Sequence, residues 1–125
     1  SEQPYLDAAL TMARGLVGAL RSDGALPGRL RSDWAAAVDW SCLTGNVQIA
    51  ESLFYLAPLG GGEGFVKAGK GLNAFVRRTI AVEGNPDLVG GVRGSFPIDG
   101  EYGQWAYLNW AAKFAIDSFL VEKLI

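Results

Sequence analysis

The sequence contains no histidine and only one cysteine, Cys42, among its 125 residues. Without histidine, this chain cannot build a Ser-His-Asp or Cys-His catalytic centre, a histidine metal site or the usual histidine pH switch. A single cysteine excludes an intrachain disulfide and a CxxC motif, so we expect Cys42 to be a small buried residue. The sequence therefore predicts neither a metal site nor a cofactor.

Excess charge and long apolar runs are also missing. Eleven basic against 13 acidic side chains leave a net charge of -2, whereas a nucleic-acid-binding surface needs a basic excess. No stretch reaches the roughly 18 apolar residues of a membrane-spanning helix, and residues 1–30 lack the pattern of a signal peptide. We therefore expect no nucleic-acid partner, no membrane span and a cytoplasmic location, unless a signal has been removed.

What the chain does contain is apolar helical patterning and glycine. Half of the residues are hydrophobic, and the 17 glycines gather between apolar segments, which is typical of loops. Apolar residues recur at spacings of three and four, which predicts helices over residues 5–21, 41–57, 63–82 and 107–124. No alternating segment exceeds four residues, so we expect an all-α fold with at most a short extended ribbon near 92–98.

The four predicted helices differ in how much of their circumference is apolar. Those at 41–57 and 107–124 are apolar on two sides, which is typical of interior helices. The helix at 63–82 has one apolar side, and we expect its polar side, which includes Lys67 and Asn73, to face solvent. Residues 33–40 are expected to add a short helical turn with Asp33 as its cap.

The chain also contains an internal repeat. Residues 24–29 align with 90–95 as G-x-(L/V)-x-G, and residues 40–43 align with 107–110, both at an offset of 66–67 positions. A constant offset indicates repeated helical hairpins. The sequence therefore predicts one domain, 1–125, made of two αα-hairpins at about 4–58 and 63–125.

This arrangement resembles the (α/α) toroid proteins, which include the terpenoid cyclases and prenyltransferases and the six-hairpin glycosidases. Residues 43–50 (LTGNVQIA) are similar to inner-helix sequences of that group. The segments GVRGSFPIDGEY, at 91–102, and LNWAAKF, at 108–114, resemble the C-terminal part of uncharacterised toroid proteins linked to bacterial polysaccharide metabolism. The resemblance implies a toroid fold and a carbohydrate-related function.

The chain departs from those families in two respects. It would supply only two hairpins, so we expect either a segment of a toroid or a small helical bundle. Its apolar sides would then be covered by further hairpins of a longer chain or by other copies in a homo-oligomer. The DxDD motif of the squalene cyclases and the zinc ligands of the protein prenyltransferases are absent, so neither activity is carried over.

Candidate site residues lie in the loops that lead into the two predicted interior helices. Asp99 and Glu101 are candidate catalytic residues, because glycoside hydrolysis uses a pair of carboxylates. Aromatic and polar neighbours could bind a sugar, which has apolar C–H faces and polar edges. The candidate substrate-binding residues are Trp34, Asp39, Trp40, Tyr102, Trp105 and Asn109. Equally, carboxylates are ordinary loop residues, and a Trp before a buried helix is often a core anchor.

Three functional hypotheses follow. The first is a carbohydrate-related toroid domain that binds or processes a polysaccharide or oligosaccharide. The second is a non-catalytic protein-interaction or scaffolding module. The third is an isoprenoid-binding toroid fragment.

Overall fold

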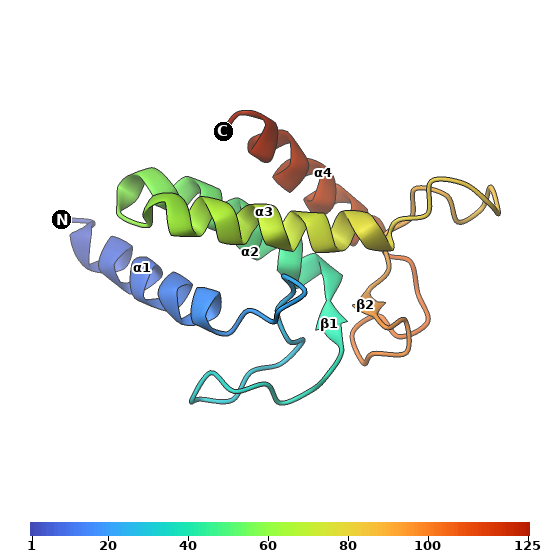
Figure 1. Cartoon of the computed structure of the whole chain (residues 1–125), viewed down its shortest axis with the longest axis horizontal. Helices are drawn as coiled ribbons and strands as arrows, with labels where there is room; N and C mark the ends of the chain where they lie inside the picture. Colours follow the sequence, from blue (N-terminus) through green and yellow to red (C-terminus); the bar gives the residue numbers. More distant parts are fainter.

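The computed structural model describes all 125 residues, and it is mostly helical with one small sheet (Figure 1). Its elements are α1 (Gln3–Gly18), β1 (Ser41–Cys42), α2 (Leu43–Leu56), η1 (Ala57–Leu59), α3 (Gly62–Thr79), β2 (Ser95–Phe96) and α4 (Asn109–Lys123). The predicted all-α class is thus broadly right, and all four predicted helices are present with small shifts at their ends.

α2 is the central helix of the fold. Its most extensive contacts are with α3 and α4, while α1 and α4 lie on opposite sides of α3 in Figure 1. α2 and α3 follow one another closely, because Pro58 ends the first helix and Gly60, with a φ of 127°, turns the chain.

The core consists of two apolar clusters that share α2 and α3. The first cluster joins these helices to α1 and includes Leu10, Leu53 and Leu72. The second joins them to α4 and includes Leu43 and Val76. Because both clusters contain residues of the same two helices, the two predicted repeats do not have separate cores.

α4 is not the interior helix that its apolar pattern predicts. Only Ala111, Ala115 and Ser118 are buried on it, and Ile116 and Leu120 are exposed. The apolar pattern shows that α4 can be buried on two sides, but this chain supplies a partner for only one side.

The polar side of α3 also differs from expectation. Asn73 is fully buried instead of solvated. Its side chain exchanges hydrogen bonds with α4, since Ser118 Oγ donates to Asn73 Oδ1 at 2.8 Å and Asn73 Nδ2 donates to the Ser118 carbonyl at 3.3 Å. A polar residue at the edge of an apolar stripe was therefore wrongly placed at the surface, because its partner lies 45 residues away.

The short helical turn predicted at 33–40 is absent. Trp34 has a left-handed backbone (φ 68°), which interrupts a right-handed helix. Asp33 nevertheless acts as a local acceptor, because its Oδ1 accepts the N–H of Ala35 at 3.0 Å. The segment is an Asx turn followed by irregular chain.

The two strands join the two long loops of the fold. β1 and β2 pair antiparallel, with Ser41 opposite Phe96 and Cys42 opposite Ser95. The N–H of Leu43 also donates to the carbonyl of Gly94 at 3.1 Å. The loop before α2 and the loop before α4 therefore meet beside the start of α2. None of the helices combines the length and the apolar character needed to cross a membrane.

Candidate ligand-binding surface

The loop before α2 is braced by a buried hydrogen-bond network. Asn46 Oδ1 accepts the N–H of Leu26 at 3.0 Å, and Asn46 Nδ2 donates to Ser41 Oγ at 2.8 Å. Ser41 Oγ in turn donates to the carbonyl of Leu26 at 2.6 Å. All three residues are buried, so the loop is held to α2 by fully satisfied polar groups.

The loop before α4 is braced in a similar way. Ser95 Oγ donates to the carbonyl of Tyr102 at 2.6 Å and accepts its N–H at 3.2 Å. The chain passes so close to itself here that a Cβ on Gly94 would lie 2.5 Å from the carbonyl oxygen of Tyr102. This position therefore requires glycine, and the backbone of Tyr102 is fixed.

Residues from both loops meet at Trp40. The guanidinium of Arg29 lies 5.5 Å from the centroid of the Trp40 ring, and its Nη1 lies 2.8 Å from Glu101 Oε2. A Cβ on Gly100 would lie 2.9 Å from the Cβ of Trp40. The structure thus brings together Trp40 and Glu101, two site residues predicted from different repeats.

Three exposed aromatic residues follow on the second loop and at the start of α4. We name Tyr102, Trp105 and Trp110 the aromatic loop surface; their exposed fractions are 37%, 69% and 48%. Trp110 Nε1 donates to the hydroxyl of Tyr102 at 3.0 Å, which links two of these side chains. The sequence interpretation missed Trp110, because it was counted in the apolar pattern of its helix.

Two tryptophans have left-handed backbones, and their rings differ in how far they are exposed. Trp34 (φ 68°) lies on α1, where a Cβ on Gly15 would be 2.2 Å from its ring. Trp34 is therefore an anchor of α1 and is not placed with the other candidate residues. Trp105 (φ 61°) has the same unfavourable backbone, which costs about 1–3 kcal/mol, yet its side chain is the more exposed of the two.

The remaining candidate residues are exposed polar groups on these loops. Asp99 is exposed, and its carbonyl accepts Gln104 Nε2 at 2.9 Å. Asp39 is exposed, and its carbonyl accepts Arg21 Nη1 at 3.0 Å. Asn109 Oδ1 accepts the N–H of Trp110 at 2.8 Å. Their side chains are available to a ligand, but none of them is held in an enclosed pocket.

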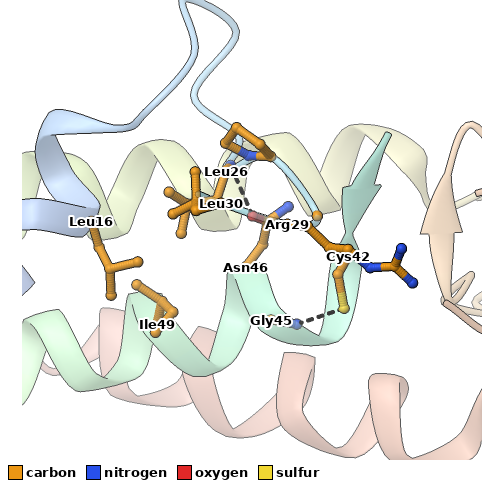
Figure 2. Close-up of a pocket in the computed structure, with 10 residues that line it drawn as sticks. Leu16, Leu26, Arg29, Leu30, Cys42, Gly45, Asn46 and Ile49 are labelled. Atoms are coloured by element: carbon orange, nitrogen blue, oxygen red, sulfur yellow. Dashed lines mark hydrogen bonds between the residues drawn. The ribbon is translucent and has the colours of Figure 1, made fainter. Parts of the chain in front are cut away.

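A separate cleft of about 270 Å³ lies between the end of α1, the loop after it and the start of α2 (Figure 2). Leu16 and Ile49 face each other across one end, and Leu30 also lines it. Asn46 reaches its edge, but both ends of its amide are already bonded within the chain. The cleft is therefore an apolar hollow without a free buried polar group.

Cys42, at the other end of the cleft, is a helix cap. Its Sγ accepts the N–H of Gly45 at 3.4 Å, as drawn in Figure 2. Burial raises the pKa of the Cys42 thiol, and the N–H groups of Gly45 and Thr44 only partly offset this. A thiol with a raised pKa is a poor nucleophile, so Cys42 has a structural role.

The chain matches no protein-family model, no curated protein and no solved structure. The resemblance to toroid proteins therefore stays a prediction, and the site has to be interpreted from its own geometry.

That geometry favours recognition of a ligand at an open surface. The exposed groups comprise flat aromatic rings, amides and carboxylates, carried on two loops that buried hydrogen bonds hold in place. No group of three or more acidic or cysteine side chains is arranged to hold a metal ion. The arrangement can stack against an apolar face and exchange hydrogen bonds with polar groups around it.

Proposed function

We propose that the aromatic loop surface binds a carbohydrate and performs no reaction on it. The observation that carries this proposal is Trp105, a largely exposed ring on a left-handed backbone. Strained backbone of this kind is found at ligand clamps. Trp34 differs, since its ring packs on Gly15 of α1 and is less exposed than the ring of Trp105.

The chemistry of the surface suits a sugar. An aromatic ring covers the apolar C–H face of a pyranose, and polar groups at the edge of the ring bind its hydroxyls. Asp99, Gln104 and Asn109 lie on the same loop or directly after it and supply such groups. The resemblance of residues 91–102 and 108–114 to polysaccharide-linked toroid proteins points to the same class of ligand.

Binding is favoured over hydrolysis by the surroundings of the two candidate catalytic residues. A glycosidase acid works in a pocket that excludes water. Glu101 is more than half exposed and is paired with Arg29, and Asp99 is exposed in the same loop. We therefore propose that these carboxylates accept hydrogen bonds from a glycan.

The test is calorimetric titration of the chain with a panel of bacterial oligosaccharides, both neutral and acidic. We expect Trp105→Ala to weaken binding by about tenfold or more, which corresponds to about 1.4 kcal/mol. Tyr55→Ala is the matched control, because Tyr55 is also an exposed aromatic (58%) and lies near the far end of α2. Circular dichroism of both variants should match the unchanged chain.

Each other outcome overturns the proposal. No binding to any glycan removes the carbohydrate ligand, and unchanged binding in Trp105→Ala removes this surface as its site. Glycan turnover that Asp99→Asn or Glu101→Gln abolishes would make the chain an enzyme. If instead only prenyl or terpenoid ligands raise the melting temperature, the isoprenoid hypothesis replaces it.

A further inference from the structure

The loops before α2 and α4 share two backbone features at a constant offset. The carbonyl of Trp40 accepts the N–H of Gly28 at 2.7 Å, and 66 positions later the carbonyl of Ala106 accepts the N–H of Gly94 at 3.0 Å. Each helix then starts directly after one residue with extended backbone, Cys42 or Leu108. Positions 66 apart in α2 and α4 are therefore structurally equivalent.

This equivalence relates a covered face of α2 to an uncovered face of α4. Ala50 and Phe54 are buried on α2, where α3 approaches so closely that a Cβ on Gly69 would lie 2.6 Å from the Phe54 ring. The equivalent residues of α4 are Ile116 and Leu120, which are 58% and 56% exposed. α4 thus has the kind of face that α3 covers on α2, but nothing in this chain covers it.

α1 carries, on its exposed side, the pattern with which α3 covers α2. Each pattern begins with an aromatic residue. Two adjacent small residues follow three and four positions later, and a large aliphatic residue follows seven positions after the aromatic one. On α3 the residues are Phe65, Ala68, Gly69 and Leu72, and all four are buried. On α1 they are Tyr5, Ala8, Ala9 and Met12, and all four are exposed. The small residues in the middle allow a second helix to approach closely.

The chain also exposes more surface than a monomer of its mass usually does. Its accessible surface is 7228 Å², against about 6,450 Å² expected from the scaling of surface with mass. Only 28 of the 125 residues are buried, and the exposed residues of α1 and α4 contribute to this excess of surface.

We propose that α1 of a second copy of this chain packs on the exposed face of α4, as α3 packs on α2. α1 and α4 lie on opposite sides of α3 (Figure 1), and their exposed faces carry different residues. The contact is therefore head-to-tail, and successive copies either close into a ring or extend as a filament. None of the residues of this contact belongs to the aromatic loop surface, so glycan binding and self-assembly can each fail alone.

The experiment measures the solution mass of the chain and of two surface variants by light scattering. Ala8→Glu places a charge on the α1 face, and Ile116→Glu places one on the α4 face. We expect the unchanged chain to form a multiple of 13.3 kDa and each variant to run at 13.3 kDa. Tyr55→Glu, on an exposed position outside both faces, should leave the assembly unchanged.

Mixing the two variants tests whether the contact is head-to-tail, between the α1 face of one copy and the α4 face of the next. Ala8→Glu keeps an intact α4 face and Ile116→Glu keeps an intact α1 face, so the mixture should form a dimer and nothing larger. A monomeric unchanged chain, a variant that still assembles, or a mixture that stays monomeric overturns the proposal. Met12→Glu and Leu120→Glu form a second pair if circular dichroism shows that either first variant has lost its helices.

Discussion

The hydroxyl of Thr44 is buried at the start of α2 and has no hydrogen-bond partner. A buried polar group without a partner destabilises the folded state, because it loses its hydrogen bonds to water and gains none in the protein. We expect Thr44→Val to raise the free energy of unfolding by about 1 kcal/mol in urea denaturation. Thr79→Val is the control and should lower it by about 1 kcal/mol, since Thr79 Oγ1 donates to the Val76 carbonyl at 2.7 Å. Equal losses in both variants would contradict this reasoning.

The cap provided by Cys42 gives a second prediction for a single residue. The side chain accepts a backbone N–H at the first turn of α2, which a serine hydroxyl does at least as well. We expect Cys42→Ser to keep the thermal stability of the chain and Cys42→Ala to lower the free energy of unfolding by about 1 kcal/mol. A loss in Cys42→Ser as large as in Cys42→Ala would show that the sulfur acts through packing instead.

Single residues also show which features of the candidate site could not be predicted from the sequence. Glycine and aromatic clusters predicted the positions of the two loops, and Arg29 joins Trp40 of one loop to Glu101 of the other. The left-handed backbone of Trp34 could not be predicted, because φ > 0 is rare for a bulky residue. Its ring is therefore on α1 and away from the other candidates. The exposure of Trp110 was missed, because a buried and an exposed apolar position of a helix look alike in sequence.

At the scale of helices, α3 and α4 are held together by a carboxylate. Glu122 accepts Arg77 Nη1 and Asn73 Nδ2, both at 2.8 Å, and its side chain is only 17% exposed. Burial by itself would raise the pKa of Glu122, but the hydrogen bonds from Arg77 and Asn73 outweigh it and hold the pKa below the ordinary 4.5.

A lowered pKa in the folded chain makes this stabilisation depend on pH. It is fully present above the unfolded pKa of about 4.5 and is lost as the pH falls through the lower folded value. We expect Glu122→Gln to lower the free energy of unfolding by about 1–3 kcal/mol at pH 7. The difference from the unchanged chain should shrink below pH 4.5. Glu83→Gln, in an exposed loop, is the control and should keep the pH profile of the unchanged chain.

Comparison of α2 with α4 explains how far the helices themselves could be predicted. Spacings of three and four located all four helices, because the core selects one face of each helix. Both α2 and α4 are apolar on two sides, and only α2 is covered on both. The spacing of apolar residues therefore predicts that a helix face can be buried. It does not predict which segment covers that face, because this depends on contacts between residues far apart in the sequence. Asn73 illustrates the same limit, because its partner Ser118 belongs to another helix.

For the whole molecule, the shared central helix determines how it unfolds. Leu53 belongs to the cluster with α1 and Leu43 to the cluster with α4, and both are fully buried residues of α2. Neither cluster can open without moving α2, so we expect one cooperative transition in place of separate melting of two hairpins. Leu53→Ala and Leu43→Ala should each lower the free energy of unfolding by about 2–5 kcal/mol.

The decisive measurement compares two probes of the same transition. Far-UV circular dichroism follows all four helices. Trp34→Phe is introduced into every chain compared, because Trp34 packs on α1, so that tryptophan fluorescence follows only Trp40, Trp105 and Trp110 in the loops and at the start of α4. If α2 couples the two clusters, the probes give one midpoint in the unchanged chain and shift together in both variants. If Leu53→Ala moves only the dichroism midpoint and leaves the fluorescence midpoint in place, the α1 side unfolds by itself. The chain would then consist of two stability units, in spite of the helix they share.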